Sequence, residues 1–72
     1  MQQQHPTFRE LAEEALLNQT DVSRQAEVSP QIARKLFEGQ TVRRYLLVQA
    51  LAVINEKLGS SYTPETVAAP YN

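Results

Sequence analysis

The sequence predicts an all-α fold, a compact domain of four to five helices, and three observations lead to this class. Apolar residues recur at intervals of three and four through most of the chain, and no segment alternates as a strand does. Residue types that begin helices stand before these periodic runs. Finally, 42% of the 72 residues are hydrophobic and only two are glycine, which favours a packed helical domain over a disordered chain.

Length and composition limit what the chain can be. A single domain of 72 residues buries about 60% of the surface of its unfolded chain. Cysteine is absent, so neither a disulfide nor a thiolate zinc site can stabilise the core. Residues 1–6 lack the basic and apolar regions of a signal peptide, and the nearly apolar stretch 45–54 is too short to cross a bilayer. We expect a cytoplasmic protein, without a membrane partner, whose residues 1–6 are flexible.

The first two helices are predicted from their N-terminal signals. Thr7 and Glu10 have the spacing of a capping box, and apolar residues follow at helical spacing, so the first helix is expected to run from Phe8 to about Leu17. Asn18 is a favourable N-cap for a second helix over residues 19–26.

The third helix, predicted over about residues 29–37, has the clearest boundaries in the sequence. Ser29 is an N-cap residue, and Pro30 stands at the first helical position, where its missing N–H is not needed. Gly39 supplies the left-handed residue that ends many helices. The apolar residues between these boundaries are Ile32, Ala33, Leu36 and Phe37.

The C-terminal third of the chain predicts one long and one short helix. Thr41 is expected to cap a helix from Val42 to Leu58 that ends at Gly59. This helix is apolar on nearly all sides, which indicates a central position in the domain or a covering partner. Thr63 followed by proline predicts a short fifth turn of helix to about residue 67, and residues 68–72 are expected to form a flexible tail.

The charges are unevenly distributed along the chain. Residues 1–23 carry one arginine and four carboxylates, residues 24–44 carry five basic residues and two glutamates, and residues 45–72 carry one lysine and two glutamates. The middle segment is therefore positive, although the formal net charge of the chain is −1. Because an approaching phosphate meets the local potential, the acidic balance does not exclude a nucleic-acid partner.

Residues 19–39 contain two short helices joined by only two or three residues. So short a linker does not allow the helices to pack antiparallel along their lengths, so they must cross steeply, as in a helix-turn-helix. The segment QTDVSRQAEVSPQIARKLFEGQT resembles, without gaps, the helix-turn-helix of lambda-repressor-like (Cro and repressor, XRE) DNA-binding domains. The positions that carry the resemblance are Gln19, Val22, Ser23, Val28, Ala33, Leu36 and Gly39.

The resemblance extends loosely over residues 8–67 and includes some departures. The family usually has alanine at Ser23 and commonly has glycine at Glu27, where a left-handed residue is tolerated at modest cost. Ile32 and Phe37 stand where the family is more often polar, and Ala33 is smaller than the usual residue. We therefore expect either a slight rotation of the third helix or a partner facing Ile32 and Phe37.

The resemblance implies a domain over residues 7–67 that binds double-stranded DNA. Gln31 would pair with adenine, and Arg34 or Lys35 with guanine O6 and N7. The base-reading positions that it implies are Gln19, Ser29, Pro30, Gln31, Arg34 and Lys35. The phosphate-contacting candidates are Arg24, Thr41, Arg43 and Arg44. Arg43 and Arg44 would equally suit a solvated surface, whereas the place of Arg34 and Lys35 on this motif favours DNA over a solvated face.

Two hypotheses of function remain open at this point. The first is a transcription regulator that binds a two-fold related operator as a homodimer. The alternative is a protein-protein interaction module on the same fold, such as an antitoxin-like or assembly partner, with Ile32 and Phe37 on the docking surface.

We do not expect an enzyme, because the sequence shows no nucleophile paired with a base, no phosphate-binding loop and no metal-ligand cluster. His5 stands alone, and the carboxylates of Glu10, Glu13 and Glu14 suit a solvated helix face. The sequence thus predicts no catalytic residue, metal, cofactor or small-molecule substrate.

Overall fold

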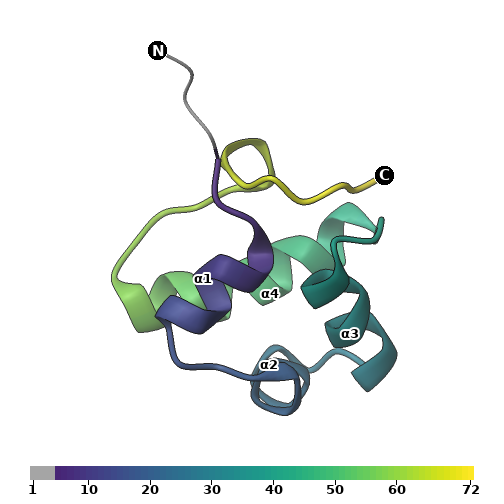
Figure 1. Ribbon diagram of the computed structural model, residues 1–72, viewed down its shortest axis with the longest axis horizontal. Helices are drawn as coiled ribbons and strands as arrows, with labels where there is room; N and C mark the ends of the chain where they lie inside the picture. The colour runs from purple at the N-terminus through teal and green to yellow at the C-terminus, as the bar shows by residue number, and fades with distance from the viewer. Residues whose placement is uncertain (1–4) are drawn as a thin grey trace.

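The computed structural model describes residues 5–72, and this part of the chain folds into four α-helices and one 3-10 turn without a β-strand (Figure 1). The predicted all-α class is therefore confirmed. The helical segments are α1 (Phe8–Glu14), α2 (Gln19–Ala26), α3 (Pro30–Glu38), α4 (Arg44–Leu58) and the 3-10 turn η1 (Pro64–Thr66). Helices α1 and α2 each pack against both α3 and α4. In Figure 1, α2 is seen nearly end-on while α3 lies across the view, so these two neighbours cross steeply.

The core consists of apolar side chains from all four α-helices. Helix α4 contributes Leu47, Ala50, Leu51 and Ile54, which share one face and are at most 1% exposed. Phe8, Leu11 and Val22 are the largest fully buried side chains of the first two helices. The opposite face of α4 leaves Tyr45 60% and Val48 41% exposed, so this apolar helix is covered on one side only.

Helix α1 ends at Glu14, three residues earlier than predicted. Leu16 has a left-handed φ of 60°, and its N–H donates to the carbonyl of Glu13 at 3.1 Å. The N–H of Leu17 reaches back to the carbonyl of Ala12 at 2.8 Å. This pair of hydrogen bonds is a Schellman ending, which normally uses glycine at the left-handed position. The sequence therefore gave no sign of it, because leucine is a favourable helix residue.

The predicted start of the fourth helix was wrong, because Thr41 does not cap it. Helix α4 begins at Arg44 after Arg43, and no side chain of the described chain makes its N-cap hydrogen bond. Val42 is instead extended and forms a parallel bridge with Tyr71. Burial of the Val42 side chain, which is 4% exposed, and pairing with the C-terminal segment thus delay the helix by two residues.

The C-terminal segment is anchored at several points. Asn55 donates from Nδ2 to the carbonyl of Tyr62 at 2.9 Å, and its Oδ1 accepts from the backbone N–H of Tyr62 at 2.8 Å. The expected fifth turn is confirmed as η1. Beyond it, the N–H of Ala68 donates to the Pro6 carbonyl at 2.8 Å, and the N–H of Asn72 donates to the Val42 carbonyl at 3.0 Å. The flexibility expected of residues 68–72 stays a prediction, as it does for residues 1–6, of which the first four lie outside the described residues.

Candidate nucleic-acid interface

The turn between α2 and α3 is defined by one left-handed residue and two hydrogen bonds. Glu27 has a left-handed φ of 57°, and the N–H of Val28 donates to the carbonyl of Ser23 at 3.1 Å. The Ser23 hydroxyl donates to the carbonyl of Val28 at 2.7 Å and so closes the turn from the other side. Serine therefore contributes a hydrogen bond at a position where alanine would contribute none. Glu27 carries the left-handed conformation that the sequence led us to expect.

Helix α3 is formed by the signals predicted for it and presents one polar face. The Ser29 hydroxyl accepts the N–H of Ile32 at 3.3 Å, and Gly39 ends the helix with a left-handed φ of 76°. Ala33 and Leu36 are buried. The face opposite these two carries only exposed polar and charged side chains, namely Gln31, Arg34, Lys35 and Glu38.

Ile32 and Phe37, the two apolar residues of α3 whose direction the sequence left undecided, both lie against the core. The Phe37 ring meets the buried Phe8 ring edge-on, with centroids 5.8 Å apart and an interplanar angle of 70°. Ile32 is half-buried and packs against the same core cluster. Neither residue therefore stands on the exposed polar face, but both stay partly exposed, Ile32 at the hollow between α3 and α4 and Phe37 at the hollow beside α1, so a partner that covers them stays a prediction.

Arg34 is engaged by an acidic neighbour on its own helix. Its Nε donates to Oε2 of Glu38 at 2.9 Å, and the hydrogen bond and the charge of Glu38 raise the pKa of Arg34 above its ordinary value. The other oxygen of Glu38, Oε1, accepts from Nε2 of Gln40 at 2.8 Å. Sequence reasoning missed Glu38 and Gln40, although the four-residue spacing from Arg34 to Glu38 is a readable signal of a helical ion pair.

A basic hollow of about 630 Å³ lies between α3 and the start of α4. Lys35 from α3 meets Arg43 and Arg44 there, so three cations from two segments border one concavity. Thr41 and Tyr45 provide hydroxyl groups on the same rim. Such a set of donors suits phosphate oxygens. The structure thus brings together one base-reading candidate and three of the four phosphate candidates.

Arg44 also has an intramolecular partner. Its Nη2 lies 3.4 Å from Oε2 of Glu65, and the Tyr71 hydroxyl donates to the same carboxylate oxygen at 3.2 Å. Both side chains of the ion pair are more than half exposed, so the pair is a weak one in water. A phosphate can therefore compete with Glu65 for Arg44.

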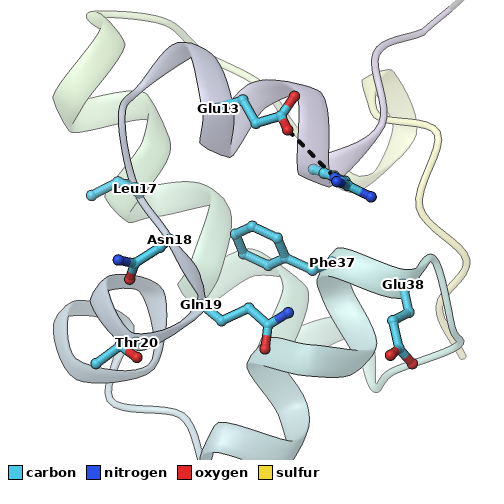
Figure 2. A pocket seen from close by; sticks show the side chains of 8 residues that line it. Glu13, Leu17, Asn18, Gln19, Thr20, Phe37 and Glu38 are labelled. Atoms are coloured by element: carbon cyan, nitrogen blue, oxygen red, sulfur yellow. Dashed lines mark ion pairs between the residues drawn. The ribbon is translucent and has the colours of Figure 1, made fainter.

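A second hollow, of about 600 Å³, separates α1 from the beginning of α2 and the end of α3. Figure 2 shows the Phe37 ring in this hollow and the Gln19 side chain extending from α2 toward α3. Glu38 borders this hollow and also a shallow depression lined by Gln31, Arg34 and Lys35. Lys35 in turn borders the basic hollow. Gln19 therefore shares a hollow with Glu38 but borders neither the depression on the polar face of α3 nor the basic hollow.

The remaining predicted site residues lie less centrally. Ser29 and Pro30 are exposed at the first turn of α3, next to Gln31. Arg24 is exposed in the last turn of α2 and borders none of the three hollows described above. Tyr45, which sequence reasoning did not select, borders the basic hollow because α4 begins only at Arg44.

Comparison of the chain with protein-family models, curated proteins and solved structures yields no match. None of the helices within residues 5–72 combines the length and apolar character that a membrane crossing requires. Among the same residues, no three histidine or carboxylate side chains gather as a metal site would need.

Proposed function

We propose that the chain is a lambda-repressor-like helix-turn-helix domain that binds double-stranded DNA in a sequence-specific manner and regulates transcription. Helix α3 would enter the major groove, with α2 lying across the phosphate backbone. The protein contributes no chemical step in this proposal. Its function is to recognise a site and to remain bound there.

One observation carries the proposal. Helices α2 and α3 cross steeply through a tight turn (Figure 1), and the outward face of α3 carries polar and charged side chains that can read base edges. Gln31 offers the amide that suits adenine, and Arg34 and Lys35 offer donors that suit guanine. Because Ile32 and Phe37 pack against the core cluster, these two residues do not favour the alternative protein-docking module.

Phosphate contacts would fix the orientation of α3. Arg43, directly before α4, borders the same basic hollow as Lys35 of α3, so it would contact a phosphate next to the bases that α3 would read. The backbone N–H groups of Gln19 and Thr20, in the first turn of α2, add donors on the other side of α3. Contacts on both sides of a recognition helix are what sets its register in the groove.

We further propose that two copies bind together. A two-fold related pair would place its recognition helices about 34 Å apart, one turn of DNA. Val48 and Ala52, exposed apolar residues on α4, form the surface that we assign to the second copy. A single half-site should then bind much more weakly than two half-sites at this spacing, and sedimentation of the complex should give two chains per duplex.

The primary test is selection from a random pool of duplexes, followed by affinity measurements at several salt concentrations. We expect an enriched sequence and an affinity that falls steeply as salt rises, because counterions are released from the phosphates. A flat salt response, or a pool without any enriched sequence, would refute the proposal.

Single substitutions then identify the reading surface. Replacement of Arg34 by alanine should cost about 1–3 kcal/mol of binding free energy on the selected site if this side chain contacts a base. Replacement of Arg43 should weaken selected and unrelated duplexes equally and lower the salt slope by about one. Lys57→Ala is the matched control, because it also removes one positive charge. Lys57 lies in the last turn of α4, away from α3.

A further inference from the structure

Glu38 is the acidic residue on the polar face of α3, and its position poses a problem for the proposed function. A carboxylate on a surface that approaches phosphates weakens binding through repulsion. Its side chain is 41% exposed, less than the 70% of its partner Arg34. Glu38 is also engaged at both oxygens, by Arg34 on one and Gln40 on the other.

The backbone sets this arrangement. Gly39 is left-handed, so the chain reverses at the end of α3 and the N–H of Gln40 donates to the carbonyl of Lys35 at 2.9 Å. The reversal brings the Gln40 side chain to Oε1 of Glu38. The carboxylate is thereby held from the loop side, and its second oxygen accepts the Nε–H of Arg34 at 2.9 Å.

The choice of the Nε atom matters for recognition. A guanidinium has five N–H donors, and one of them is used by Glu38, so both terminal nitrogens keep their donors. A pair of parallel donors is what the O6 and N7 acceptors of guanine require. A long arginine side chain otherwise loses considerable rotamer freedom when it is fixed in one geometry.

We propose that Glu38 is a positioning residue for Arg34, and that the pair makes the second turn of α3 selective for guanine. This inference rests on the proposed DNA-binding function. The raised pKa of Arg34 agrees with it, because the hydrogen bond and the charge of Glu38 stabilise the cation. Glu38 touches no base in this arrangement; it acts through the orientation of the guanidinium.

The experiment uses the selected duplex and a set of copies in which each guanine is replaced in turn by adenine or by 7-deazaguanine, which lacks N7. For the wild-type protein, one guanine should stand out, with affinity lowered about 5-fold to 150-fold by adenine, the effect of losing a bidentate pair. Arg34→Ala should be insensitive to replacement of that guanine and unchanged in its response to the others.

Two variants of Glu38 separate positioning from charge. Glu38→Ala should reduce the guanine preference at that one position several-fold, toward the value of Arg34→Ala. Glu38→Gln keeps an oxygen that can accept from Nε, so it should retain most of the preference. Glu56→Ala, which removes an exposed carboxylate from α4, is the control and should leave the preference intact.

The outcomes are distinct. If Glu38→Ala binds all duplexes more tightly while keeping its full guanine preference, Glu38 only neutralises charge and the inference is overturned. If no guanine depends on Arg34, the inference fails while DNA binding stands. If the wild-type protein binds no duplex in a salt-dependent manner, the proposed function fails and takes the inference with it.

Discussion

Helices α3 and α4 differ in what determines where they begin and what they do for the molecule. Helix α3 starts where the Ser29 hydroxyl accepts a backbone N–H, within four residues of itself. Helix α4 starts two residues after Val42, which pairs with Tyr71 near the C-terminal end of the chain. The short helix is defined locally and faces outward, whereas the long helix is defined by distant contacts and supplies much of the core. The bounds of α3 therefore do not depend on Gln31, Arg34 and Lys35, which lie on its outward face.

The largest effect that this contrast predicts is in the core of α4. Leu47 is fully buried, so Leu47→Ala should lower the free energy of unfolding by about 2–5 kcal/mol through lost burial and a residual cavity. Gln49→Ala, at an exposed position of the same helix outside the surface assigned to the second copy, is the control and should change it by less than about 0.5 kcal/mol. Urea denaturation followed by circular dichroism measures both, and similar losses for the two variants would contradict the one-sided burial of α4.

The second effect concerns the contacts that join the end of α4 to the segment that follows it. Asn55→Ala would leave the N–H and the carbonyl of Tyr62 without their side-chain partner. We expect a loss of about 1–3 kcal/mol, the cost of leaving partly buried polar groups unpaired. Glu56→Ala is the exposed neighbour for comparison. Amide exchange at Tyr62 should accelerate in the first variant only; an unchanged rate there would argue against this anchor.

The same contrast explains how far the sequence could be interpreted. Ser29, Pro30 and Gly39 act within a few residues of where they stand, so the bounds of α3 were predictable. The early end of α1 was not, because Leu16 adopts a left-handed conformation that its side chain does not favour. Periodicity and capping rules miss such a boundary, and they also miss one that depends on tertiary pairing, as the start of α4 does.

In the candidate site, too, some features follow from local spacing and others depend on contacts between helices. The outward face of α3 follows from helical spacing once Ala33 and Leu36 are assigned to the core. The inward packing of Phe37 required the position of Phe8, on another helix, and so could not be derived from spacing. The basic hollow likewise depends on where α4 begins, which decides that Arg43 and Lys35 border one concavity.

A smaller effect tests the local definition of α3. Ser29→Ala removes the side-chain acceptor of the Ile32 N–H and should lower the free energy of unfolding by about 1 kcal/mol. Ser29→Asp restores an acceptor and adds a charge that favours a helix N-terminus, so it should recover most of the loss. If both variants are equally unstable, the cap does not define this helix.

The smallest expected effect is the most discriminating for the start of α4. A capping threonine would lose about 1 kcal/mol on replacement by alanine, as at Ser29. Thr41 is exposed and stands two residues before Arg43, the actual N-cap, so Thr41→Ala should change the free energy of unfolding by less than about 0.5 kcal/mol. Removing the distant partner should matter more: Tyr71→Gly deletes the side chain that donates to Glu65 and loosens the segment paired with Val42. A Thr41→Ala loss as large as that of Ser29→Ala would mean that both helices are defined locally after all, and the difference between α3 and α4 would then lie in their surfaces alone.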